Sequence, residues 1–146
     1  VLEALVRDMG ALADVKGVEL TGQFSAGEIE GDPQRLRQLL AILLDNALKY
    51  TPEGGRIDVR ATRQGSRVTL SVSDTGPGIP ADDIAHIFDR FYRADSARAP
   101  QTGTGLGLAI ARWIAPATEV IARLPAWYPC SSLSCLRSSM STSRMP

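Results

Sequence analysis

Residues 36–52 read LRQLLAILLDNALKYTP, and this stretch supplies the central element of the predicted fold. In a helix, which turns by about 100° per residue, its apolar side chains share one broad face, namely Leu36, Leu40, Leu43, Leu44 and Ala47. The other side carries Gln38, Asp45, Asn46 and Lys49, with Ile42 between Asn46 and Lys49 and Tyr50 beside Asn46. Asn46 and Lys49 can approach one ligand together, although a solvated edge of Asp45 and Lys49 explains the pattern equally well.

The ends of this helix are marked in the sequence. Asp32 is a favoured N-cap residue, and Pro33 suits the first helical position because its missing N–H has no helical partner there. Pro52 disfavours helical conformation at Thr51. The helix is therefore predicted to begin at Pro33 and to end near Tyr50.

The other predicted elements make a sheet with helices on one face. We expect helices over residues 2–13 (ending before Gly17), 81–92 and 103–114, and strands over 18–24, 56–62 and 67–74. A turn near Ala26–Gly27 and an extended piece over 28–31 precede the central helix, and Gln64-Gly65-Ser66 closes a hairpin. The apolar hairpin positions on one face are Ile57, Val59, Ala61, Val68, Leu70 and Val72. The predicted fold class is an α+β two-layer sandwich with a mixed sheet.

Length and charge exclude several classes of protein. The 146 residues suit one domain, and 16 basic and 16 acidic residues give no electrostatic footprint for nucleic acid or a membrane surface. No apolar run reaches the roughly 18 residues of a membrane-spanning helix. Cys130 and Cys135 match neither a zinc nor a redox spacing, so a reducing cytoplasm is expected.

Four motifs follow one another in a fixed order: LLDNALKYTP, DTGPGIP, IFDRFYRAD and GTGLGLAIARWI. Together they resemble the conserved motifs of the catalytic ATP-binding domain of bacterial sensor histidine kinases (HATPase_c, of the GHKL superfamily), which is related to gyrase B, Hsp90 and MutL. The matching motifs are the N box (39–52), the G1 box (74–80), the ATP lid with the F box (81–102) and the G2 box (103–114). The resemblance covers residues 1–114 and implies a GHKL-type (Bergerat) fold that binds ATP and Mg²⁺.

The resemblance assigns roles on both sides of the nucleotide. Asp74, at a strand end, offers an acceptor to the adenine amino group, and Gly76 and Gly78 let the base approach the backbone. Asn46 offers a neutral oxygen to Mg²⁺, and Lys49 offers a point charge to a phosphate. Arg93 matches the family's phosphate-contacting arginine, so Asn46, Lys49 and Arg93 are the expected catalytic residues.

The remaining expected ATP-binding residues are Tyr50, Ile79, Gly103, Thr104, Gly105, Leu106, Gly107 and Leu108. The three glycines expose N–H groups where a helix begins, which favours an anion. A polar loop precedes them, whereas the dinucleotide fingerprint of a Rossmann fold follows a strand. Phe88 and Phe91 are expected to anchor the lid to the core. For Tyr50, a role in core packing is as good an explanation as contact with the nucleotide.

Ile42 departs from the family pattern. Hydrolysing relatives carry an acidic base four positions before the Asn, and kinases usually carry Asn there. With Ile42, water lacks a general base. The pattern favours transfer of the γ-phosphoryl group to a histidine over hydrolysis.

The phosphoryl acceptor is not found in this sequence. The single histidine, His86, lacks the family's acceptor context and is expected to be a partly solvated lid residue. The resemblance implies that a dimerisation and histidine phosphotransfer domain precedes Val1 in a parent kinase, either cytoplasmic or anchored in the inner or plasma membrane. It also implies that a response regulator acts downstream.

The tail is the second departure. Residues 115–146, APATEVIARLPAWYPCSSLSCLRSSMSTSRMP, replace the family's two closing strands with a Ser-rich run that indicates disorder or a shifted reading frame. Residues 118–123 can still form one strand. Two alternatives to a kinase domain stay open: a degenerate module that binds nucleotide without transfer, and a GHKL-type ATPase.

Overall fold

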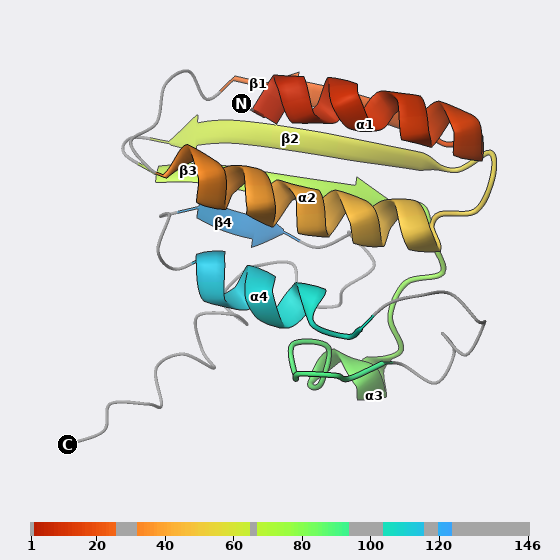
Figure 1. Ribbon diagram of the computed structural model, residues 1–146, viewed down its shortest axis with the longest axis vertical. Helices are drawn as coiled ribbons and strands as arrows, with labels where there is room; N and C mark the ends of the chain where they lie inside the picture. The colour runs from red at the N-terminus through yellow and green to blue at the C-terminus, as the bar shows by residue number, and fades with distance from the viewer. Residues whose placement is uncertain (1, 26–31, 65–66, 94–103, 116–119, 124–146) are drawn as a thin grey trace.

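The computed structural model describes residues 2–25, 32–64, 67–93, 104–115 and 120–123. The elements in chain order are α1 (Leu2–Lys16), β1 (Glu19–Phe24), α2 (Pro33–Tyr50), β2 (Arg56–Gln64), β3 (Arg67–Asp74), α3 (Ala81–Ile84), α4 (Gly107–Ile114) and β4 (Val120–Arg123). Figure 1 shows α1 and α2 in front of the sheet and α4 below β4, next to α2, which confirms the predicted two-layer α+β arrangement. The predicted turns at 26–27 and 65–66 and the extended piece at 28–31 lie outside the described residues.

The sheet is mixed, in the order β1-β2-β3-β4. β1 runs parallel to β2, β2 and β3 form an antiparallel pair, and β4 runs parallel to β3. The pairing of Val68 with Val120 begins the β3–β4 ladder. The described part of the segment 118–123 therefore forms the strand that the sequence allowed, and the sheet extends beyond Ile114. Residues 124–146 lie outside the described part of the chain.

The boundaries of α2 follow the local signals. The carboxylate of Asp32 accepts hydrogen bonds from the backbone N–H groups of Gln34 (2.9 Å) and Arg35 (3.3 Å), so it caps two otherwise unpaired donors. Thr51 is extended (ψ 125°), and its hydroxyl donates to the carbonyl oxygen of Ala47 at 2.7 Å. The helix ends at Tyr50, as Pro52 predicts.

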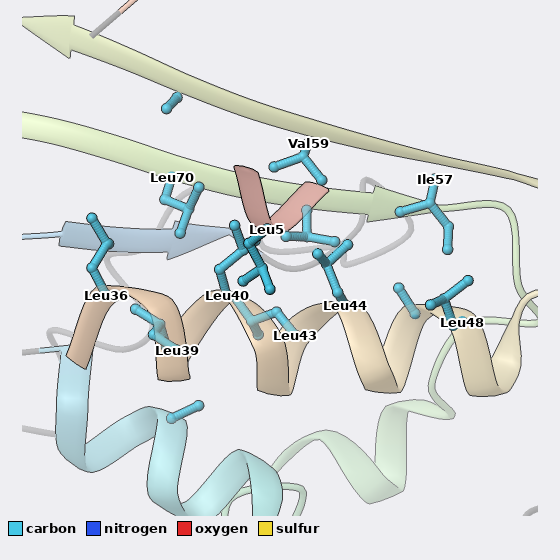
Figure 2. Packing of buried hydrophobic residues seen from close by; sticks show 14 of the residues in the cluster. Leu5, Leu36, Leu39, Leu40, Leu43, Leu44, Leu48, Ile57, Val59 and Leu70 are labelled. Carbon is cyan, nitrogen blue, oxygen red and sulfur yellow. The ribbon is translucent and has the colours of Figure 1, made fainter. Parts of the chain in front are cut away.

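The core lies between α2 and the sheet (Figure 2). All predicted core positions of α2 and of the hairpin are buried, and the other buried positions of α2 are Leu39 and Leu48. Leu5 of α1 and Ile114 of α4 complete this core from either side. Truncating one of these leucines to alanine costs about 2–5 kcal/mol of stability, since the cavity it leaves collapses only in part. The broad buried face leaves α2 a narrow polar stripe for function.

Two predicted helices are shorter in the structure. The helix predicted over 81–92 is wrong beyond Ile84, because turns follow α3 and Phe91 takes a left-handed conformation (φ 65°) that no helix contains. Phe91 is 70% exposed, so the prediction that it anchors this segment to the core is also wrong. The last helix begins at Gly107, after Gly105 at φ 69°, and not at residue 103.

Candidate functional site

Three elements meet beside the carboxyl half of α2: α2 itself, the loop that follows β3, and the amino end of α4 (Figure 1). A Cβ atom added to Gly107 would lie 3.3 Å from Cγ2 of Ile42 and 3.8 Å from Nδ2 of Asn46. The first turn of α4 therefore packs directly on the half-buried side chains of Ile42 and Asn46. The glycine motif and the central helix, far apart in sequence, form one site.

Asp74 ends β3 on the same side of the molecule. Its half-buried carboxylate accepts a 2.8 Å hydrogen bond from the backbone N–H of Gly76. A Cβ atom on Gly76 would lie 2.7 Å from that carboxylate and 3.0 Å from the carbonyl oxygen of Tyr50, so a larger residue would force the Asp74 side chain and the Tyr50 backbone to shift. Burial raises the pKa of Asp74 above its ordinary value, an effect that the Gly76 N–H opposes by stabilising the charged form.

The loop continues through Gly78 and Ile79. Gly78 has a φ of 74°, a conformation that glycine adopts without strain, and it is exposed, whereas Ile79 is half-buried. Asp74, Gly76 and Gly78 thus line one loop against the last turn of α2. This loop brings a carboxylate and open backbone together, as the motif DTGPGIP predicts.

The last turn of α2 carries Lys49, the residue predicted to offer a positive charge to a phosphate. The ammonium of Lys49 lies over the ring of Tyr50, with Nζ 5.0 Å from the ring centroid. Lys49 is half-buried, and Tyr50 is 44% exposed. Both side chains therefore remain accessible to a ligand beside Asn46.

Gly105 joins the glycine motif to the segment that follows α3. A Cβ atom on it would lie 2.8 Å from both the carbonyl carbon of Phe91 and the carbonyl oxygen of Tyr92. The N–H of Phe91 donates to the carbonyl oxygen of Gly105 at 3.0 Å. Thr104 is exposed and Leu106 half-buried in the same motif.

Leu108, also half-buried, packs against the core. Gly103, the first glycine predicted for the motif, lies outside the described residues. The structure therefore shows where the second and third glycines lie, and the roles of all three glycines in binding ATP remain predictions.

The segment after α3 is held by its own polar pairs. The hydroxyl of Tyr92 donates to Asp83 at 2.6 Å, and Nδ1 of His86 lies 2.9 Å from Oδ2 of Asp89. Arg112 of α4 places its guanidinium carbon 5.8 Å from the ring centroid of the half-buried Phe88. His86 is exposed, as predicted. Arg93 is exposed at the end of this described segment.

Lys16, which contacts the carboxyl end of α2, was not predicted from the sequence as part of the site. The ammonium of Lys16 donates to the carbonyl oxygens of Leu48 and Lys49 in the last turn of α2. The only signal available was a basic residue in the last turn of a predicted helix, just before Gly17. Such a residue usually serves its own helix, so the sequence did not point to α2.

Similarity to known proteins identifies the family to which the chain belongs. The model of the histidine kinase-, DNA gyrase B- and HSP90-like ATPases matches residues 31–124. The chain belongs to this family. Sensor histidine kinase YkoH of Bacillus subtilis is 52% identical over 88 residues, which make up 60% of this chain and 19% of that protein. The chain thus spans about a fifth of the length of this curated relative.

Solved structures agree with this assignment. The mycobacterial sensor histidine kinase MprB is 32% identical with a TM-score of 0.68, over 79% of this chain and 76% of the solved one. Full-length ShkA in complex with AMPPNP is 37% identical with a TM-score of 0.67, over 80% of this chain and 25% of that one. The chain corresponds to the ATP-binding catalytic domain of a sensor histidine kinase, and its fold is the predicted GHKL-type sandwich.

The described residues contain neither a metal-binding cluster of side chains nor a membrane-spanning helix. No group of three or more His, Cys, Asp or Glu residues among them could hold a metal ion. Within the same ranges, no helix has the length and apolar character needed to cross a bilayer.

Proposed function

We propose that the chain binds Mg·ATP between α2, the loop after β3 and the start of α4, and donates the γ-phosphoryl group to a histidine on a separate dimerisation domain. The observation that carries this proposal is the packing of Gly107 on Asn46, with 3.8 Å between Nδ2 and the Cβ position. In this contact the side-chain amide of Asn46, whose oxygen is able to bind a metal ion, lies next to the start of α4 and its backbone N–H groups. Both are chemically suited to a magnesium–phosphate group.

Asp74 is proposed to recognise adenine. Its carboxylate is fixed by the Gly76 N–H, which leaves lone pairs for the exocyclic amino group of the base. Gly76 has no side chain to obstruct the base, and the tight contact with the Tyr50 carbonyl keeps the loop in place. Gly78, Ile79 and Tyr50 are proposed to contact the nucleotide from the same loop and the adjacent helix end.

Asn46 is proposed as the protein ligand of Mg²⁺. The ion prefers six oxygen ligands and commonly keeps several waters and substrate phosphates among them. The lack of an acidic or histidine cluster in the described segments fits this mode, because one amide oxygen suffices when ATP supplies the others. Mg²⁺ would then enter with the nucleotide and neutralise charge on its phosphates.

Lys49, Arg93 and the glycine motif are proposed to hold the phosphates. Lys49 lies one turn beyond Asn46 on α2, and backbone N–H groups around the start of α4 come from Thr104, Gly105, Leu106, Gly107 and Leu108. Gly103, outside the described residues, is proposed to act with them. Arg93 lies on the segment that Gly105 holds through Phe91. These groups would act by positioning and by stabilising charge, which is how phosphoryl transfer is mostly catalysed.

Transfer is proposed over hydrolysis because of Ile42. Hydrolysing relatives carry their acidic base at this sequence position, and here the methyl group of Ile42 packs beside Gly107 instead, so this position offers no group that accepts a proton from water. In the proposed step an imidazole nitrogen forms the bond to γ-phosphorus while the bond to the bridging oxygen breaks, and ADP leaves. The acceptor histidine belongs to the dimerisation and phosphotransfer domain, and a response regulator would receive the group from it.

A two-stage experiment tests the proposal. The chain is titrated with AMPPNP in Mg²⁺ and in EDTA, and is then mixed with labelled ATP and a purified dimerisation domain that carries the acceptor histidine. Magnesium-dependent binding followed by labelling of the histidine is the expected result. Binding without transfer would favour a nucleotide-binding module, and rapid phosphate release without the second domain would favour an ATPase.

A further inference from the structure

We infer that Lys16 is a positioning residue for the nucleotide: its ammonium fixes the last turn of α2, and through it Lys49 and the loop after β3. The inference rests on the proposed function, since it concerns how that site is held. Lys16 lies on α1, outside the residues that match the family model. It touches no part of the proposed ligand directly.

The first argument is the hydrogen bonding of the helix end. The last carbonyl groups of an α-helix have no partners within the helix. In α2, the carbonyl of Ala47 accepts from the backbone N–H and the hydroxyl of Thr51, and those of Leu48 and Lys49 accept from the ammonium of Lys16, at 3.1 Å for Lys49. Lys16 therefore satisfies two of the last four carbonyls of α2.

The second argument is electrostatic. The carboxyl ends of α1 and α2 lie at the same end of the molecule (Figure 1), so the negative ends of two helix dipoles meet there. The half-buried Lys16 supplies positive charge between them. Removing it leaves two negative helix ends and two unpaired carbonyls together, which favours fraying of the last turn of α2.

The third argument connects this turn to the site. Lys49, whose carbonyl Lys16 holds, presents its side chain to the proposed phosphates. Tyr50 comes next, and its carbonyl oxygen would lie 3.0 Å from a Cβ on Gly76, beside Asp74. The connection to α1 is reinforced by a 2.7 Å hydrogen bond from the N–H of Gly54 to the carbonyl of Gly17. Movement of this turn would displace the phosphate cation and the adenine loop together.

The chain offers a matched control. Arg37 of α2 and Asp8 of α1 form an ion pair at 3.6 Å, away from the last turn. Arg37→Met removes a cation that joins the same two helices without touching that turn. Lys16→Arg keeps charge and donors, and Lys16→Met keeps only an apolar stem.

The test is titration of the full 146-residue chain and its variants with Mg·AMPPNP, at a temperature where circular dichroism shows every variant folded. Lys16→Met should weaken binding about fivefold to tenfold, whereas Lys16→Arg and Arg37→Met should stay within about twofold of the unaltered chain. Because Lys16 acts through the turn that bears Lys49, its loss should cost less in a Lys49→Ala background. If Lys16→Met does not fold, Lys16→Gln takes its place with the same expectation.

Each other outcome is decisive. Unchanged affinity in Lys16→Met, failure of Lys16→Arg to retain binding, or full additivity with Lys49→Ala would overturn the role of Lys16 while leaving the proposed function standing. Absence of binding by the unaltered chain would overturn the proposed function and this inference with it.

Discussion

The backbone N–H of Phe91 donates a 3.0 Å hydrogen bond to the carbonyl oxygen of Gly105, which joins the segment after α3 to the glycine motif before α4. Phe91 is left-handed and 70% exposed, so its side chain contributes little to holding this position. The contact depends on the missing side chain of Gly105. Backbone packing, and not an aromatic anchor, thus sets the distance between the two segments.

Gly105→Ala should disrupt this contact. A Cβ atom would meet the Phe91 and Tyr92 backbone at 2.8 Å, and a left-handed alanine costs about 1–2 kcal/mol by itself. We expect a loss of Mg·AMPPNP affinity of about tenfold in a titration. Gly10→Ala is the control, because Gly10 lies inside α1 with nothing within 4 Å of its Cβ position. It should stabilise the fold by about 0.5–1 kcal/mol and leave binding unchanged. Equal binding by both variants would contradict the role of Gly105.

Asn46→Ala should abolish the magnesium-dependent part of nucleotide binding. The proposed ligand oxygen is lost, while the half-buried position still tolerates a small apolar residue beside Gly107. The measurement is AMPPNP affinity in Mg²⁺ and in EDTA, with Gln38→Ala, an exposed amide on the same helix, as the control. A difference between Mg²⁺ and EDTA that persists in Asn46→Ala would show that the metal binds elsewhere.

Asp74→Asn separates recognition from stability. The amide oxygen can still accept from Gly76, but an amide is a weaker partner for the adenine amino group, so the preference for AMPPNP over GMPPNP should shrink.

The same substitution should also change stability. The pKa of Asp74 is raised mainly by burial, so its charge opposes folding above that pKa, and protonation relieves the cost as pH falls. Without nucleotide, the variant should melt at a higher temperature than the unaltered chain at pH 7, and the gap should close in acid. A lower melting temperature at pH 7 would contradict this account.

Asp58→Asn should change the melting temperature at pH 7 in the opposite direction, that is, lower it. Asp58 accepts hydrogen bonds from Arg56 at 2.7 Å and from the hydroxyl of Thr21 at 2.5 Å, and these hold its pKa below the ordinary value of 3.8. A lowered pKa in the folded state adds stability above the unfolded-state pKa, and this stability is lost as pH falls through the folded-state pKa. The variant should therefore melt at a lower temperature at pH 7, with the difference shrinking as pH falls past 3.8 and vanishing only below the lowered folded-state pKa. A difference independent of pH would show that the charge of Asp58 is not its cause.

Much of the fold follows from local rules that the sequence displays. Asp32 and Pro33 begin α2 and Pro52 ends it, since capping and the steric effect of proline act within a few residues. The alternation through Ile57 and Leu70 fixes which face of the hairpin is buried. The four motifs likewise identified the family, because their order and chemistry are properties of the chain itself.

Tertiary structure decided the rest. The helical pattern after Ala81 stops at Ile84, and Phe91 turns left-handed to bond Gly105, a partner that no local pattern names. The short strand β4 exists through pairing with β3, since four residues cannot form a strand without a neighbour.

The candidate site likewise depends partly on the sequence and partly on the tertiary structure. The sequence determined the residue types, namely an amide and a lysine one turn apart, a carboxylate after a strand, and glycines before a helix. Only the folded chain set Gly107 against Asn46, Gly76 against the Tyr50 carbonyl, and Lys16 on the end of α2. These are close approaches between segments distant in sequence. Their geometry depends on how the helices pack on the sheet, and no periodicity or capping rule contains that information.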